Sequence, residues 1–170
     1  KLFGEPINHF DHWERIAYVS QHSINFDENF PLSVRELVGL GRITRENLGR
    51  RLKRSDWEHV DKALGYMGIT DIADIRLGNL SGGQKQRAFV AKAMVRHPMV
   101  LILDEPVTGI DAEAQKRFYM RLSNLNMERE MTILIVSHDL AAVFCRMSKV
   151  LAVNGRIYVT DIGPDRDPNG

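Results

Sequence analysis

A pair of glycines between polar residues gives this sequence its most specific chemistry, which is the binding of a phosphate group. Residues 80–87 read Leu-Ser-Gly-Gly-Gln-Lys-Gln-Arg. Because Gly82 and Gly83 have no Cβ atoms, several backbone N–H groups can approach an anion there. Ser81 and Gln84 fit the S-x-x-Q capping pattern, which predicts the start of a helix whose positive end favours phosphate. The alternative is a glycine turn before an ordinary capped helix.

Two acidic residues follow a short apolar run further along the chain. The run is 100–103, and Asp104 and Glu105 come directly after it. It is too short to span a membrane, and it predicts a buried parallel strand that delivers its acids at the carboxyl edge of a sheet. The alternative is that the pair only ends a strand and caps the next turn.

The order of five short segments resembles that of the ATP-binding cassette (ABC) ATPases, which drive membrane transporters. The matching positions are Gln21 for the Q-loop, 80–84 for the signature loop, 101–105 for the Walker B strand, 109–111 for the D-loop and His138 for the switch histidine. A single match could arise by chance, whereas five in order between suitable elements are specific. The resemblance covers nearly the whole chain.

The resemblance implies a division of roles in the hydrolysis of ATP. Asp104 would hold Mg²⁺, largely through water, because this ion keeps much of its hydration shell. Glu105 would be the general base, and His138 would contact the γ-phosphate and hold the base and the water in position. Gln21 would offer an amide oxygen to Mg²⁺ and link the nucleotide to a partner protein.

The signature loop would serve a second copy of the domain. In this family it grips ATP bound to the partner in a head-to-tail dimer, a role that falls here to Ser81, Gly82, Gly83 and Gln84. Asp111 would belong to the same interface. It could also be the N-cap of a helix from Ala112 onward, and both roles can hold at once.

The family's phosphate loop, G-x-x-x-x-G-K-[ST], does not occur in these residues, and no Gly-Lys dipeptide is present. We expect residues 1–4 to be the end of a strand that follows such a loop. The chain is therefore predicted to hold a partial ABC ATPase domain over 1–163, with a helical subdomain at about 33–97, and to be inactive alone. The tail 164–170 is predicted to be disordered.

Alternating strands and helices predict an α/β fold with a parallel sheet, in the manner of the P-loop NTPases that the family resembles. Strands are expected at 15–20, 99–104, 132–137 and 149–153. Asn154-Gly155 predicts a two-residue hairpin turn after the last of them. Between 33 and 75 helices replace strands, with capping boxes at Ser33/Glu36 and Ser55/Glu58.

Composition points to part of one globular domain in a reducing compartment. Of the residues, 44% are hydrophobic and 26% charged, and Cys145 is the only cysteine. A net charge of +1 gives no bulk reason to expect nucleic acid as a partner, although the basic run 50–54 could form a local patch. No signal peptide or membrane span is evident. Attachment to the cytoplasmic face of the membrane would come through a permease.

The cargo is inferred only from resemblance. Residues 26–42 and 105–119 are similar to ATPases of zinc and manganese importers, although Val107 stands where Thr is more usual. This implies uptake of a metal ion through a membrane permease, served indirectly by a substrate-binding protein, while iron chelates or another small cargo stay open. Phe30 and Leu32 are the expected permease contacts, and Val34 and Leu37 are expected in the core.

Other functions also stay open. A soluble ABC ATPase of translation or DNA repair is one, although residues 33–80 lack the sustained heptads of the repair enzymes' coiled coil. A degenerate regulatory domain without a phosphate loop is another, and the dimer could be formed by like or unlike subunits. His9 and His12 suggest a metal pair, but these histidines, with His22, His59 and His97, are interpreted as solvated loop residues.

Overall fold

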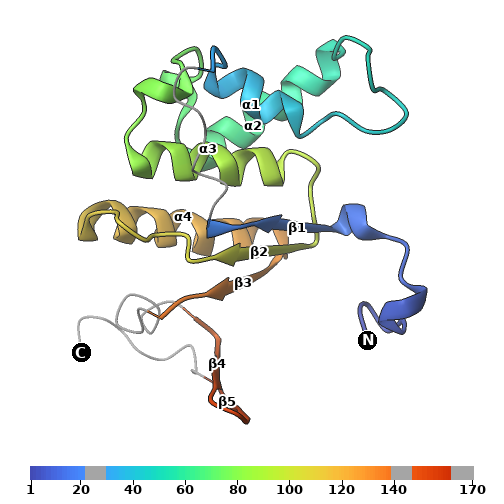
Figure 1. Cartoon of the computed structure of the whole chain (residues 1–170), viewed down its shortest axis with the longest axis vertical. Coiled ribbons are helices and arrows are strands. Elements are labelled where there is room, and N and C mark those ends of the chain that lie inside the picture. Colours follow the sequence, from blue (N-terminus) through green and yellow to red (C-terminus); the bar gives the residue numbers. More distant parts are fainter. Residues whose placement is uncertain (22–29, 139–146, 162–170) are drawn as a thin grey trace.

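The computed structural model describes residues 1–21, 30–138 and 147–161. Figure 1 shows a layer of helices α1, α2 and α3 above a three-stranded sheet, with α4 beside the sheet and a hairpin extending away from it. The elements are β1 (Ile16–Val19), α1 (Val34–Leu40), α2 (Arg54–Met67), α3 (Gly82–Met94), β2 (Val100–Asp104), α4 (Ala112–Arg129), β3 (Thr132–Val136), β4 (Lys149–Val153) and β5 (Ile157–Asp161). Short 3₁₀ helices cover Ile7–His9, Trp13–Arg15, Thr70–Ile72 and Leu77–Asn79.

The three-stranded sheet has the order β1-β2-β3 and is parallel throughout. Its register pairs Val19 with Leu103, and Asp104 with Val136. The carboxyl ends of β2 and β3 therefore meet at one edge of the sheet. The predicted α/β architecture is confirmed, and the four predicted strands are found with ends shortened by a residue or so.

The two faces of this sheet differ in burial. Leu101 and Leu103 are fully buried on the face covered by α4, and Ile133 and Ile135 pack there too. The opposite face leaves Tyr18, Leu134 and Val136 between 44% and 59% exposed. β2 itself alternates buried and half-buried residues, so the predicted buried parallel strand is found, with its better-covered face toward α4.

The helical layer begins with a capping box that the sequence predicted. The Ser33 side chain caps α1 by accepting from the Glu36 backbone N–H at 3.2 Å, while the Glu36 carboxylate accepts from the Ser33 backbone at 2.8 Å. Val34 and Leu37 are buried, as expected. Leu32 is partly buried and packs against the same core, whereas Phe30 is 50% exposed. Of the two expected permease contacts, the structure thus leaves only Phe30 well exposed.

The start of α2 corrects the second predicted capping box. Lys53, rather than Ser55, is the N-cap, and its backbone N–H donates to Asp56 Oδ2 at 3.0 Å. Arg42 Nε lies 2.9 Å from Asp56 Oδ1. Because this carboxylate is buried, it requires both partners, and their positions fix the helix start two residues earlier than predicted.

Two turns also differ from expectation. Residues 1–4 do not form the end of a strand, because Leu2 and Glu5 exchange backbone hydrogen bonds of 2.8 and 2.9 Å around a tight turn. Phe3 and Gly4 take positive φ angles of 47° and 87° in that turn. The predicted hairpin exists, but Val153 pairs with Ile157, so three residues rather than two connect β4 to β5.

Several further expectations can be compared with the described part of the chain. No helix there is long and apolar enough to cross a membrane. His59 lies in α2 with its ring 5.0 Å from that of His97, so the interpretation of His59 as a loop residue was wrong. The predicted tail, His22 and Cys145 lie outside the described residues.

Candidate functional site

The carboxyl edge of the sheet brings Glu105 and His138 together. Glu105 has a left-handed backbone with φ 47°, and its N–H donates to the Val136 carbonyl at 2.9 Å. Its Oε1 atom accepts from the His138 backbone N–H at 3.1 Å and lies 2.7 Å from His138 Nδ1. The Glu105 side chain is 18% exposed and that of His138 is 81% exposed. Since a carboxylate can only accept, the Nδ1 atom donates, which fixes the orientation of the acid.

An unusual backbone at Glu105 accompanies this contact. A non-glycine residue in the left-handed region carries strain of about 1–3 kcal/mol, which persists only where the surroundings hold it. Here the anchors are the β3 carbonyl and the His138 contact. The strand therefore ends in a turn that aims the carboxylate along the sheet edge.

Asp104 lies beside this pair and contacts the neighbouring strand. The Tyr18 hydroxyl donates to Asp104 Oδ2 at 3.0 Å. Tyr18 pairs in register with Ile102, so its side chain stands on the same face of the sheet as that of Asp104. The hydrogen bond to Asp104 raises the pKa of Tyr18, with smaller effects from desolvation and the carboxylate charge. Tyr18 thus stays neutral and holds one carboxylate oxygen in place, a contact that sequence reasoning missed.

The donor set around Asp104 is compatible with Mg²⁺. The described residues hold no cluster of three or more His, Cys, Asp or Glu side chains that could enclose a metal ion. Mg²⁺ does not need one, because it is commonly held by one or two carboxylates together with water and phosphate oxygens. Gln21 is exposed just beyond β1 and forms no hydrogen bond with Asp104 in the described structure.

The glycine-rich segment forms the capped helix start that its sequence predicts. The Gln84 backbone N–H donates to Ser81 Oγ at 3.3 Å, and the Ser81 N–H donates to Gln84 Oε1 at 2.8 Å. The remaining N–H groups of the first turn of α3 therefore face outward at the positive end of the helix.

Neither glycine of this segment is required by the fold. Both have helical backbones without positive φ. A Cβ at Gly82 would meet nothing within 4 Å, and one at Gly83 would only touch Ile110 at 3.6 Å and Ala114 at 3.9 Å. Glycine in a helix costs about 1 kcal/mol relative to alanine. This cost, without a packing reason, is typical of a site where a ligand approaches the backbone.

The start of α4 faces the same segment. Asp111 is the N-cap of α4, accepting from the Ala114 N–H at 2.9 Å, which confirms the capping role predicted for it. Gln115 Nε2 donates to the carbonyls of Ile110 at 3.0 Å and Val107 at 3.3 Å. These bonds hold the loop before α4, where Gly109 has φ 75°. The role of Gln115 was not predicted.

A cavity of about 330 Å³ separates the two helix starts. The residues that line it include all five that were assigned to the signature and D-loop interface, together with two arginines that sequence reasoning missed. These residues are Ser81, Gly82, Gly83, Gln84, Asp111, Arg87 and Arg117. Neither Asp104, Glu105 nor His138 lines it, so the predicted residues form two separate groups.

Arg87 is fixed by main-chain oxygens of two helices. Its Nη1 atom donates to the Gly68 carbonyl at 3.1 Å, and its Nε donates to Gly83 at 3.4 Å. Burial lowers the pKa of Arg87, as do the charges of Arg121 and Arg117, while Asp71 opposes them. Two helix N-termini and Arg87 bring positive charge to this cavity, which suits a phosphate group, while Arg117 pairs with Glu113 and Asp111 adds one carboxylate.

Known proteins resemble this chain over most of its length. Residues 4–108 match the model of the ABC transporter family. The chain is 44% identical over 156 residues to the zinc uptake system ATP-binding protein ZurA of Listeria innocua, covering 92% of this chain and 61% of ZurA. It is 42% identical over 125 residues to the zinc transport system ATP-binding protein AdcC of Streptococcus pneumoniae, covering 74% and 53% of the two chains.

A solved structure shows the same fold. It is an inward-facing ABC transporter described as of the metal-chelate type, with a TM-score of 0.77 and 28% identity, covering 86% of this chain and 57% of the other. The chain therefore spans between 53% and 61% of the length of these relatives.

Proposed function

Because the chain belongs to the ABC transporter family, we propose that the complete protein is the ATP-hydrolysing subunit of a transporter that takes up a metal ion, with zinc or manganese as cargo. The observation that carries the ATPase proposal is the 2.7 Å contact between Glu105 and His138 at the carboxyl edge of a parallel sheet. Metal as the class of cargo is supported by the names of relatives that are zinc uptake and zinc transport proteins.

In this mechanism the described residues act on ATP and water. Glu105 takes the proton of the attacking water, and the Nδ1 contact of His138 keeps the carboxylate oriented for it. Asp104 would hold Mg²⁺ through water, and Gln21, two residues beyond β1, would supply an amide oxygen. When bound, Mg²⁺ neutralises charge on the β- and γ-phosphates.

The second group of residues is assigned to the partner's nucleotide. Ser81, Gly82, Gly83 and Gln84 present the N-terminus of α3 to the γ-phosphate of ATP held by a second copy, and Asp111 lies at the same head-to-tail interface. Arg87 adds positive charge behind them, and Arg117, which pairs with Glu113, lines the same cavity. The phosphate loop G-x-x-x-x-G-K-[ST], which would bind the phosphates of a subunit's own ATP, is not among the motifs of these 170 residues. Tight ATP binding is therefore assigned to the complete protein.

The remaining assignments follow from the proposed activity. The chain covers a partial ATPase domain over 1–163, with its helical subdomain at about 33–97. It works at the cytoplasmic face of the membrane, bound to an integral permease that receives cargo from a substrate-binding protein. Nucleic acid has no part in this function.

Transport by the reconstituted complex tests the proposal. The full-length protein and its permease in liposomes should accumulate ⁶⁵Zn²⁺ only when Mg-ATP is supplied on the side of the ATPase. A Glu105→Gln complex should fail to do so. If the complex takes up a different cargo with ATP and takes up neither Zn²⁺ nor Mn²⁺, the metal assignment is overturned. ATP-dependent uptake by the Glu105→Gln complex would overturn the mechanism.

A further inference from the structure

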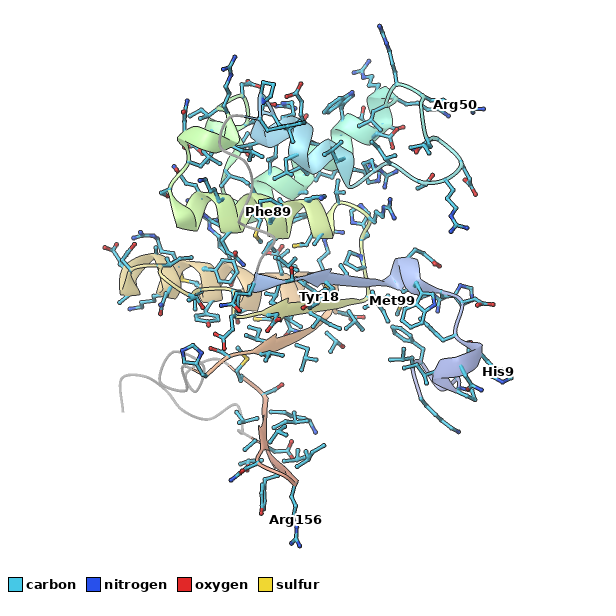
Figure 2. All side chains as sticks on the ribbon, in the orientation of Figure 1. His9, Tyr18, Arg50, Phe89, Met99 and Arg156 are labelled. Carbon is cyan, nitrogen blue, oxygen red and sulfur yellow. The ribbon has the colours of Figure 1, made fainter. Side chains whose placement is uncertain are left out.

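A second cavity lies at the joint between the helical layer and the sheet, away from both groups of site residues. Its volume is about 230 Å³. It is formed by α2, the end of α3, the residues before β2, and the turn from α4 into β3. The lining residues are Ala63, Tyr66, Met94, His97, Pro98, Met99, Arg129, Glu130 and Met131. Figure 2 shows Met99 at the start of β2, the end of the strand opposite to Asp104.

Five of the nine residues that line this cavity are apolar. Ala63, Met94 and Met131 are buried, and Met99 is 51% exposed at its rim. Methionine side chains are flexible and polarisable, and they adapt to ligands of irregular shape. The volume corresponds to roughly eight water molecules at about 30 Å³ each, which matches a ligand of about eight non-hydrogen atoms.

One cation, Arg129, lines the cavity and is positioned by two neighbouring side chains. The Arg129 guanidinium carbon lies 4.6 Å from the centre of the Tyr66 ring. The guanidinium also donates to the Tyr66 hydroxyl and, at 3.3 Å, to His97 Nδ1. Among the described residues no carboxylate forms an ion pair with Arg129, and the exposed Glu130 beside it does not pair with it either. The charge is thus positioned but not neutralised.

Three of the four polar side chains that line the cavity can donate to a ligand, and the fourth, Glu130, is an exposed carboxylate. Because Arg129 can only donate, His97 Nδ1 must accept, and the proton of the neutral ring is on Nε2. Partial burial lowers the pKa of His97, with Arg129 and His59 adding to the effect, which favours this neutral ring. The Tyr66 oxygen accepts from Arg129, so its own proton is available to donate. Arg129, His97 and Tyr66 thus each have an N–H or O–H group that can donate to an oxygen of a ligand.

Backbone conformation at the same place is unusual. His97 and Glu130 have φ angles of 58° and 49°. They are two of the four non-glycine residues with positive φ in the described part of the chain, and a third is Glu105 at the catalytic edge. Glu130 is the left-handed C-cap of α4, a common way for a helix to end, whereas His97, three residues beyond α3, carries strain of the kind that clusters at sites of function.

We propose that this cavity binds a small amphipathic anion, with a carboxylate at Arg129, His97 and Tyr66 and a short apolar body among the three methionines. The site is independent of the proposed ATPase chemistry. Because the ligand would touch α2 and α3 on one side and the starts of β2 and β3 on the other, its binding would restrain the helical layer relative to the sheet. Both strands run from this cavity to the catalytic edge.

Methionine methyl NMR tests the proposal directly. The sequence has seven methionines, of which Met94, Met99 and Met131 line the cavity and four do not. In protein labelled with [¹³C-methyl]methionine, hexanoate should shift these three methyl signals saturably. Acetate has the charge without the apolar body and hexanol the body without the charge, so both should bind roughly tenfold or more weakly. Equal binding of hexanol would overturn the assignment of an anion, and no saturable shift with hexanoate would overturn the site.

Two variants and a control complete the test. Arg129→Gln should weaken hexanoate binding by roughly tenfold or more, because a charge-assisted hydrogen bond is lost. Tyr66→Phe keeps the ring under the guanidinium and removes only the hydroxyl, so it should weaken binding several-fold even if Arg129→Gln fails to fold. Arg54→Gln removes the same charge from a side chain that is 96% exposed on α2 and should change nothing. Wild-type affinity for hexanoate in Tyr66→Phe would refute the proposal if Arg129→Gln also binds hexanoate with wild-type affinity. It would refute the proposal equally if Arg129→Gln does not fold.

Discussion

At the scale of single residues, the account depends most on Glu105. Replacing it with Gln keeps an oxygen that accepts from the His138 backbone N–H but removes the ability to take a proton. We expect ATP hydrolysis by the full-length protein to fall by about 10²–10⁴-fold. ATP binding should survive, and the variant should accumulate as an ATP-bound dimer in size-exclusion chromatography. Glu58→Gln, on the exposed side of α2, is the control. Wild-type turnover by Glu105→Gln would remove this residue from the mechanism.

Tyr18 offers a finer test at the same scale. Tyr18→Phe retains the ring on the sheet face and removes the hydroxyl that donates to Asp104. Losing a residue that orients a metal ligand costs about 10–100-fold in metal affinity. The Mg²⁺ concentration for half-maximal hydrolysis should therefore rise by about tenfold, while the rate at saturating Mg²⁺ stays close to normal. Tyr158→Phe on β5 is the control. An unchanged Mg²⁺ dependence would mean that the contact has no part in holding the ion.

At the scale of elements, the start of α1 should make stability depend on pH. Backbone and side-chain hydrogen bonds from Ser33 lower the pKa of Glu36. Its stabilising effect is therefore present above the unfolded pKa of about 4.3 and is lost as pH falls through the lower folded value. Glu36→Gln keeps an oxygen that accepts from the Ser33 N–H and removes only the charge, so it should be less stable by about 0.3–1 kcal/mol at neutral pH and should lose less stability on acidification. Urea unfolding at pH 7 and pH 3 measures this. Glu46→Gln, in an exposed loop, should follow the wild type, and a variant with the wild-type pH profile would contradict the account.

The segment before α1 is the expected contact with the permease. Because Leu32 packs partly into the core, an acid there would disturb folding and binding together, whereas Phe30 is 50% exposed. Phe30→Asp should weaken co-purification with the permease and leave the circular dichroism spectrum and ATP binding unchanged. Leu48→Asp is a matched control, since Leu48 is 74% exposed in another loop. Undiminished co-purification of Phe30→Asp would place the contact elsewhere.

Elements with strong local signals were predictable from the sequence. Apolar runs located β2 and β3, and capping patterns located the starts of α1 and α3. The start of α2 was not predictable, because it depends on Arg42, fourteen residues before Asp56, pairing with a buried carboxylate. The same reason applies to Tyr18, Arg87 and Gln115. Their contacts arise from tertiary packing and follow no spacing in the sequence.

At the scale of the whole molecule, the two groups of functional residues face different nucleotides in the proposed dimer. The acids of one copy and the signature segment of the other would complete each site. This arrangement accounts for a glycine pair that neither backbone conformation nor internal packing demands. It also explains why the acids and the signature residues, although all were predicted from the sequence, do not line one cavity within a single chain.

Mixing two inactive variants of the full-length protein tests this central claim most directly. Gly82→Asp places a carboxylate where a Cβ meets no atom within 4 Å, so α3 should form while phosphate is repelled. Glu105→Gln removes the base. A mixed dimer then has one site with both defects and one site with neither. If subunits assort randomly, phosphate release should recover to roughly a quarter of the wild-type rate, because about half of the dimers are mixed and each has one intact site of two. A mixture that forms mixed dimers but remains as inactive as either variant alone would contradict the account.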